Sequence, residues 1–238
     1  KNFLKLLNKT KIAISNDDTR HYLNGVFLHL TEVHGRNFLT GVATDSHRLS
    51  SSSVEIENTN NFSSLILPRK AVYQLCSLLS ESNEKFSMQT SENKVKFNLG
   101  SIKLISKVID GKFPDYKKVV PNDNKKFLVV PSKDFINSIE RVASVSLDRK
   151  EGVKLSINKE NIQLSVNSVS SGEGNEIIKA DFNSDNFNIS FNSKYLIDII
   201  SEVEDRNLKM NLKDSVSPVL IEDASDKNSY YVIMPMKI

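Results

Sequence analysis

The chain has a single cysteine, few glycines and no long apolar run, and each shortage excludes a class of protein. With Cys76 as its only cysteine, the chain of 238 residues forms no internal disulfide, which suits a reducing cytoplasm, where we expect the protein to work. We expect Cys76 to be a buried, inert thiol on the apolar side of a helix. The eight glycines are scattered and form no Gly-rich phosphate loop. No run approaches the roughly 18 apolar residues of a membrane-spanning helix, so we expect no membrane partner.

Neither sign of charge is in large excess: the net charge is +3 and the sequence pI is about 8.8. Hydrophobic residues make up 39% of the chain and charged residues 26%, which is typical of a globular protein. A mildly basic balance permits nucleic acid as a partner without requiring one. The first residues, "KNFLKLLNKT", predict a helix, and we expect the sequence to begin within a longer protein.

The sequence runs twice through one order of predicted elements: a helix, strands, a second helix and further strands. The first helices are predicted at residues 3–9 and 132–142, and the second begin at Pro68 and at the Asn192/Ser193 cap. The stretches "GVFLHL" and "GVKLSI" alternate apolar and polar residues, which predicts antiparallel sheets with one buried face. We therefore expect an α+β fold of two similar domains, residues 1–125 and 126–238.

Basic residues follow one face of three of the four predicted helices, because residues four apart in a helix share a face. Without interleaved aromatic residues, such faces can attract phosphate but cannot distinguish bases. For any one helix taken alone, an ordinary solvated surface is the simpler explanation. The candidate phosphate-contacting residues are Lys5, Lys9, Arg69, Lys70, Lys133 and Arg141.

The stretch "GVATDSHRLS" places Asp45, Ser46 and His47 side by side, and these are the residue types of a hydrolytic triad. Successive side chains on an extended chain point to opposite faces, so three neighbours cannot readily form a proton relay. The sequence has no G-x-S-x-G motif, and its four histidines are scattered with no second cysteine to join them. We expect no catalytic residue, no cofactor and no metal, and His47 by default is a surface or structural residue.

Six motifs in the chain are similar to those of one family. "LNGVFL", "VATDSHRLS", "LPRKAV", "DGKFPDYKKVVP", "DSVSPVLIEDAS" and "YVIMPMKI" together resemble the bacterial DNA polymerase III beta subunit, the sliding clamp. The resemblance implies the second and third domains of a clamp subunit, with the family's first domain absent from this sequence. It implies a ring of two subunits around duplex DNA, with sheets outside, two helices of each domain on the inner face, and the basic helix residues facing the hole. Ser144 and Val145 match positions at the interface between subunits.

The resemblance further implies a non-catalytic processivity factor with a hydrophobic peptide-binding groove between these two domains. The replicative polymerase, the clamp loader, repair polymerases and mismatch-repair proteins would insert short peptides there. An apolar cleft with basic residues on its rim suits that role. The matching positions are Leu23, Thr44, Ser46, His47, Arg48, Leu49, Pro114, Lys118, Val119, Tyr195, Val216, Val232, Met234, Pro235 and Met236.

Three positions depart from the family pattern. Ser46 replaces the usual glycine, Lys118 stands where arginine is common, and Pro218 stands where serine is common. Because proline cannot donate to a strand ladder, Pro218 predicts an edge strand. Two alternatives to the clamp remain: a standalone peptide-binding module, and a hydrolase that uses His47.

Overall fold

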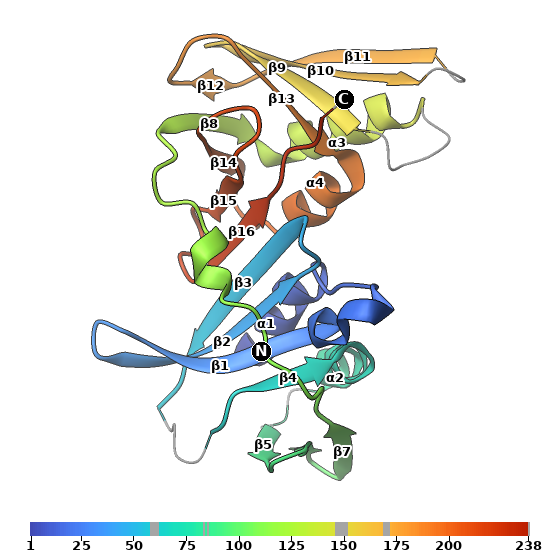
Figure 1. Ribbon diagram of the computed structural model, residues 1–238, viewed down its shortest axis with the longest axis vertical. Helices are drawn as coiled ribbons and strands as arrows, with labels where there is room; N and C mark the ends of the chain where they lie inside the picture. Colours follow the sequence, from blue (N-terminus) through green and yellow to red (C-terminus); the bar gives the residue numbers. More distant parts are fainter. Residues whose placement is uncertain (58–61, 83, 85, 146–151, 169–171, 238) are drawn as a thin grey trace. The chain divides into compact units, whose positions relative to one another are not determined.

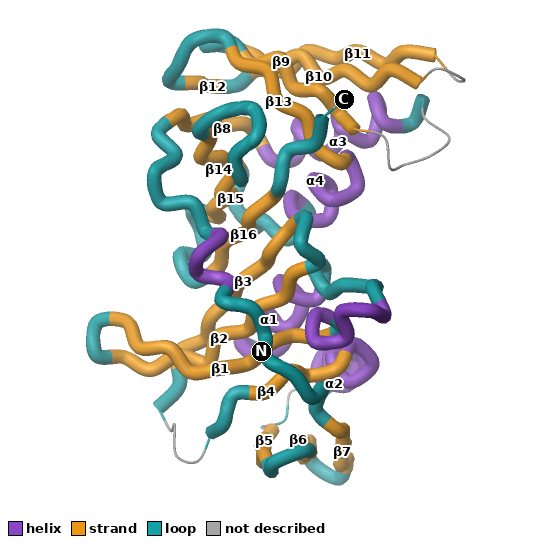
Figure 2. Tube along the Cα trace, viewed as in Figure 1, coloured by secondary structure: helices purple, strands orange, loops and turns teal. Residues whose placement is uncertain are grey.

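The computed structural model describes residues 1–57, 62–82, 84, 86–145, 152–168 and 172–237. They form two compact units, Lys1–Pro114 and Asp115–Ile238, whose elements are labelled in Figure 1 and coloured by type in Figure 2. Residues 115–125, which we expected at the end of the first domain, belong to the second unit. No helix in the described ranges is long and apolar enough to cross a membrane.

The described residues of unit 1 form two α-helices, one 3-10 helix (η1) and two antiparallel sheets. Its strand orders are β3-β2-β1-β4 and β5-β6-β7. Its elements are α1 (Asn2–Lys11), η1 (Asp18–Leu23), β1 (Gly25–Val33), β2 (Arg36–Thr44), β3 (Arg48–Glu55), β4 (Leu65–Pro68), α2 (Arg69–Glu81), β5 (Phe86–Thr90), β6 (Lys94–Leu99) and β7 (Ile102–Lys107).

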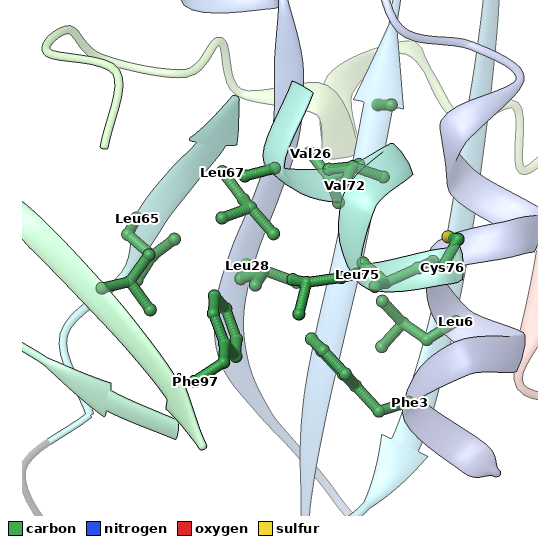
Figure 3. Close-up of a cluster of buried hydrophobic side chains, with 14 of the residues drawn as sticks. Phe3, Leu6, Val26, Leu28, Leu65, Leu67, Val72, Leu75, Cys76 and Phe97 are labelled. Carbon is green, nitrogen blue, oxygen red and sulfur yellow. The ribbon is translucent and has the colours of Figure 1, made fainter. Parts of the chain in front are cut away.

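The core of unit 1 lies where both helices meet both sheets. Figure 3 shows Phe3 and Leu6 of α1 beside Leu75 of α2, with Leu28 of β1 and Phe97 of β6 completing the cluster. The alternation in β1 buries Val26 and Leu28 completely, as the period-two pattern predicts. Cys76 belongs to the same cluster and is buried, which confirms its predicted place.

Helix α1 lies close to β2 because Gly41 has no side chain. A Cβ added at Gly41 would lie 2.5 Å from Cδ2 of Leu6 and 3.3 Å from Cγ1 of Val26. Both of those side chains are fully buried. The glycine in β2 therefore sets the distance at which α1 packs on the sheet.

Unit 2 repeats the plan of unit 1. Its sheets have the orders β11-β10-β9-β13 and β12-β8-β14-β15-β16, and the first of these matches β3-β2-β1-β4 strand for strand. Its elements are η2 (Tyr116–Val119), β8 (Lys126–Pro131), α3 (Ser132–Ala143), β9 (Gly152–Ile157), β10 (Asn161–Ser168), β11 (Gly172–Lys179), β12 (Asp181–Phe182), β13 (Phe187–Asn192), α4 (Ser193–Ile200), β14 (Asn207–Leu212), β15 (Val219–Asp223) and β16 (Ser229–Ile233). The predicted α+β fold, with antiparallel sheets and two α-helices in each repeat, is confirmed.

Two local predictions in unit 2 have different outcomes. The side chain of Asn192 accepts a hydrogen bond from the Tyr195 backbone N–H at 3.1 Å, so the predicted cap of α4 is present. Pro218, by contrast, lies just before β15 rather than inside a strand. Because β15 pairs with β14 on one side and β16 on the other, the prediction of an edge strand is wrong. Proline is tolerated there because it precedes the first ladder position.

Candidate functional site

The polar run after β2 forms the turn between β2 and β3. The carboxylate of Asp45 accepts hydrogen bonds from the backbone N–H groups of His47 and Arg48, both at 2.9 Å. The Thr44 hydroxyl donates to the Arg48 carbonyl at 2.7 Å and accepts from the Ser46 N–H at 3.2 Å. Side chains thus take the place of backbone partners in a tight turn. This role accounts for the density of polar residues in "TDSHR" without a catalytic triad.

Ser46 lies in a left-handed backbone conformation, with φ of 78°. Glycine adopts this region without steric cost, whereas a residue with a Cβ is strained there. The glycine that the family commonly has at this position therefore matches the backbone better than serine does. Compared with glycine, Ser46 adds a hydroxyl to the turn and also introduces backbone strain.

The Ser46 hydroxyl accepts a hydrogen bond of 2.5 Å from Nη1 of Arg20, which lies in η1. Nε of Arg20 in turn donates to the Asp17 carboxylate at 2.8 Å. Asp17 also accepts from the Thr19 hydroxyl at 2.6 Å. These bonds lower the pKa of Asp17 to about 2, and the hydrogen bond from the Thr19 hydroxyl contributes most to the change. Arg20 was not among the predicted site residues. The spacing of Asp17 and Arg20 in "DDTR", three residues apart, could have indicated an ion pair there.

Three residues of unit 1 that were predicted on the rim or wall of the groove are buried. The Arg48 side chain is 8% exposed and its Nε lies 3.2 Å from a carboxylate oxygen of Asp45. Arg48 is therefore a structural part of the turn, which corrects its predicted place on the rim. Leu49 and Leu23 are also buried, at 2% and 3% exposure. Pro114, the last residue of unit 1, is exposed.

In unit 2, a short turn presents Val216 to solvent. The Asp214 carboxylate accepts from the backbone N–H groups of Val216 and Ser217, at 3.0 and 2.6 Å, and from the Ser217 hydroxyl at 2.7 Å. The hydrogen bond from the Ser217 hydroxyl, followed by the backbone bonds, lowers the pKa of Asp214. Val216 is 60% exposed, so the turn holds an apolar side chain out in water.

Two further predicted groove residues of unit 2 are exposed apolar side chains: Val119 at 52% and Met234 at 39%. Val232 is buried, while Tyr195, Pro235 and Met236 are partly buried. The segment after β16 is fixed by a hydrogen bond of 2.8 Å from the Met236 N–H to the Ser190 carbonyl. Lys118 is exposed and lies 3.3 Å from Asp115, a surface pair that contributes little stability.

Two of the predicted DNA-facing residues are held within unit 1. Nη2 of Arg69 donates to the backbone carbonyls of Ile14 and Ser15, at 3.0 and 2.6 Å. Lys9 is only 2% exposed, and its carbonyl accepts from the Ser50 hydroxyl at 2.5 Å. The prediction of an outward-facing Lys9 is therefore wrong. Lys5 is partly buried and Lys70 is exposed.

On α3, Lys133 is exposed, while Arg141 forms an ion pair with Glu176 of β11. Nε of Arg141 donates to Glu176 at 3.0 Å, and Nη2 donates to the other carboxylate oxygen. These bonds raise the pKa of Arg141 and lower that of Glu176. Ser144, just after α3, is exposed and its hydroxyl donates to the Arg141 carbonyl at 2.7 Å, while Val145 is partly buried.

A separate cleft of about 1040 Å³ lies in unit 1 between β4 and the β5–β6 turn. Its lining includes Leu65, Ile66, Glu92, Val108 and Phe113, and it includes none of the predicted groove residues, all of which are described. Within the described ranges, no group of three or more His, Cys, Asp or Glu side chains is placed to hold a metal ion.

The two units correspond to two domains of a known subunit. The family model described as the central domain of the DNA polymerase III beta subunit matches residues 1–115. The model of the C-terminal domain of the same subunit matches residues 117–237. The chain belongs to the DNA polymerase III beta subunit family. The resemblance carried by its motifs is thereby confirmed.

Relatives in this family are named beta sliding clamps. That of Caulobacter vibrioides (strain NA1000 / CB15N) is 35% identical over 236 residues, which are 99% of this chain and 63% of the relative. That of Escherichia coli (strain K12) is 32% identical over 234 residues, 98% of this chain and 63% of the relative. The chain therefore spans less than two thirds of the length of these relatives.

Solved structures of beta subunits share the fold of this chain. A Caulobacter crescentus beta sliding clamp superposes with a TM-score of 0.97 at 35% identity, covering 100% of this chain and 63% of that one. A Bartonella birtlesii sliding clamp bound to griselimycin gives a TM-score of 0.95 at 38% identity, covering 99% and 64%. The DNA clamp fold predicted from the motifs is confirmed.

Proposed function

We propose that the chain is part of a DNA sliding clamp, a processivity factor that encircles duplex DNA and tethers the replicative polymerase. The match to the central and C-terminal beta-subunit domains, in order over nearly the whole chain, carries this proposal. The protein would have no catalytic residues of its own and would act in the cytoplasm. A second subunit would close the ring, with Ser144 and Val145 at the interface.

We further propose that short apolar peptides of the polymerase, the clamp loader and repair proteins bind a groove to which both domains contribute. Three of the predicted groove positions carry exposed apolar side chains, which a bound apolar peptide could cover. Val119, Val216 and Met234 are such side chains in unit 2. The β2–β3 turn, fixed by Asp45, supplies the residues of unit 1.

Truncation of the exposed residues tests the peptide site. We expect Met234→Ala and Val216→Ala each to weaken binding of an apolar pentapeptide such as QLxLF by about tenfold, because each removes apolar contact worth roughly 1–3 kcal/mol. Fluorescence anisotropy with a labelled peptide measures the affinity. Leu49→Ala is less suitable, because truncating a buried leucine costs about 2–5 kcal/mol of folding stability.

Val33→Ala is the matched control, since Val33 is 50% exposed but lies outside the predicted site. It should bind the peptide like the wild type. Equal titration curves for the wild type, Met234→Ala and Val216→Ala would contradict the assigned site. A peptidase and esterase screen with a His47→Ala control tests the hydrolase alternative, which predicts activity that is lost in the variant.

A further inference from the structure

The strand β4 beside the cleft of unit 1 has an exact counterpart in the repeat. The sheets β3-β2-β1-β4 and β11-β10-β9-β13 match strand for strand. Gly25 at the start of β1 pairs with Pro68 of β4. Gly152 at the start of β9 pairs with Asn192 of β13 in the same way. β4 and β13 are therefore equivalent strands in equivalent register.

One backbone hydrogen bond recurs at the same position of these two strands. Ile66 and Ser190 are equivalent, because each lies two residues before the end pair of its ladder. The Ile66 carbonyl accepts a hydrogen bond from the Ile109 N–H at 2.9 Å. The Ser190 carbonyl accepts one from the Met236 N–H at 2.8 Å. The segment after β7 thus returns to its sheet as the segment after β16 does.

The walls of the cleft follow this correspondence. They come from β4, the β5–β6 turn and the segment after β7. In unit 2, the β14–β15 turn carries the predicted groove residue Val216, and the segment after β16 carries Met234. The cleft, with Phe27, Leu65 and Val108 in its lining, has a volume of about 1040 Å³, at the upper end of the roughly 300–1,000 Å³ of ligand sites. Unit 1 therefore has its own version of what unit 2 contributes to the proposed groove.

β4 leaves one edge of its sheet open beside the cleft. β1 pairs with β4 on one side. On the other side, the backbone of the described chain pairs with β4 only at the isolated Ile66–Ile109 bridge. An edge strand with so few partners can pair with the backbone of an extended peptide. This edge favours an extended peptide over a compact ligand.

Acidic side chains determine the charge of the cleft. Glu92 of the β5–β6 turn and Asp110 after β7 are exposed in its lining, and Lys112 is the one basic residue among the lining residues, all of which are described. Neither carboxylate has an ion pair or a hydrogen bond within the described ranges. Two carboxylates beside one ammonium favour a basic ligand.

We propose that this cleft is a second peptide site, which takes extended peptides in which lysine or arginine alternates with apolar residues. Successive side chains of an extended peptide point to opposite faces. The apolar face would cover Phe27 and Val108, and the basic face would meet Glu92 and Asp110. The inference rests on the proposed function, because the groove residues of unit 2 give the cleft its counterpart.

Two acetylated and amidated peptides, KLKLF and QLQLF, test the inference in chemical-shift titrations of the isotope-labelled chain. Amide signals of Val108 and Ile109 report on the cleft, and those of Val216 and Met234 report on the groove. We expect KLKLF to bind the cleft about tenfold more tightly than QLQLF, the effect of two partly exposed ion pairs. At a concentration that saturates the groove, QLQLF should leave the cleft signals in place.

Three variants assign the effect to the cleft. The double variant Glu92→Gln/Asp110→Asn should lose the preference for KLKLF. Ser64→Trp, at an exposed residue of the lining, should fill the cleft and abolish binding there. Glu32→Gln removes an exposed carboxylate outside the cleft and should keep the full preference. All three should leave the groove signals in the QLQLF titration unchanged.

The outcomes separate this inference from the proposed function. No cleft shifts with KLKLF, equal affinities of both peptides at the cleft, or an unchanged preference in the double variant would overturn the inference and leave the groove intact. Cleft binding of KLKLF without any groove shifts by QLQLF would contradict the proposed groove and support the cleft. No shifts with either peptide would overturn both.

Discussion

Single carboxylates build the turns that carry the candidate site. Asp45 accepts two backbone N–H groups in the β2–β3 turn, and Asp214 does the same in the turn that exposes Val216. Asp17 accepts the N–H and the hydroxyl of Thr19 at 2.9 and 2.6 Å. The hydrogen bonds to Asp17 and Asp214 favour the ionised carboxylate and lower the pKa of both groups. The local geometry of the site therefore depends on individual acidic side chains.

The lowered pKa of Asp17 predicts a pH-dependent contribution to stability. Its pKa falls from 3.8 to about 2 because of hydrogen bonds from Thr19 and then Arg20. A group whose pKa is lowered by folding stabilises the fold above its unfolded pKa and ceases to do so as pH falls through its folded pKa. We expect Asp17→Asn to lower the thermal unfolding midpoint at pH 7, and the deficit to shrink as pH falls from about 4 to about 2.

Asp18→Asn is the control, because Asp18 is the exposed neighbour of Asp17 in the same segment. Its unfolding midpoint should follow that of the wild type at every pH. Circular dichroism melts of the three proteins measure the effect. A deficit of Asp17→Asn that stayed constant between pH 7 and pH 2 would show that the loss has no electrostatic origin.

At the scale of elements, α3 lies directly on β11, and Gly174 permits the close approach. A Cβ at Gly174 would lie 2.9 Å from the Val142 carbonyl oxygen and 3.3 Å from Cγ1 of Val145. Backbone cannot move aside as a flexible side chain can. We expect Gly174→Ala to lower the free energy of unfolding by about 1–3 kcal/mol, the usual cost of overpacking.

Urea titration measures that change. Asn175→Ala, at the next and exposed position of β11, should change stability by less than about 0.5 kcal/mol. Equal urea midpoints for Gly174→Ala and the wild type would contradict this prediction, because they would show that α3 can move away from β11 at little cost in free energy.

Strands with alternating apolar residues could be predicted from the sequence, and others could not. β1 and β9 have the expected pattern, whereas β3 contains four consecutive serines, Ser50 to Ser53, which favour turns over strands. Three of them are buried, and Ser53 and Thr40 pair their hydroxyls at 2.8 Å. The hydroxyls of Ser50 and Ser53 have partners on α1 and β2 that are distant in sequence, so no local pattern could reveal the strand.

The candidate site was predictable where a motif marks it and not where burial in the folded chain decides it. "TDSHR" marked the β2–β3 turn, but it did not reveal that the Arg48 side chain is only 8% exposed. Helical periodicity placed Lys9 on a polar face with Lys5, yet Lys9 is buried in the structure. Periodicity shows which residues share a face of a helix and does not show what covers that face.

For the whole molecule, the exposure of each basic residue and its pairing with acidic residues predict how the chain contacts DNA. Lys70 and Lys133 are exposed, whereas Arg141 shares its charge with Glu176. The isolated chain should bind linear duplex weakly, with a dissociation constant on the order of 10⁻⁴–10⁻⁶ M at physiological salt and no sequence preference. Lys133→Gln should weaken this binding and reduce its salt dependence more than Arg141→Gln, because Arg141 is paired with Glu176, whereas Lys133 has no ion pair among the described residues.

A salt series by fluorescence anisotropy on duplex DNA measures these differences. Binding of one duplex sequence at nanomolar affinity in about 150 mM salt would contradict a non-specific role for these helices. Light scattering of the same 238-residue chain should show a monomer at micromolar concentration, since closing the proposed ring would need the family's first domain. A stable dimer would contradict that mode of assembly.

The most direct test of the central claim, that this chain holds a clamp-type peptide site, is a chemical-shift map of the isotope-labelled chain titrated with an apolar QLxLF peptide. The account predicts that amide signals of Ser46 and His47 in unit 1 and of Val216 and Met234 in unit 2 shift together at one peptide affinity. Signals of Glu92 and Val108, in the separate cleft beside β4, should stay in place. Shifts confined to that cleft, or no shifts at millimolar peptide, would contradict it.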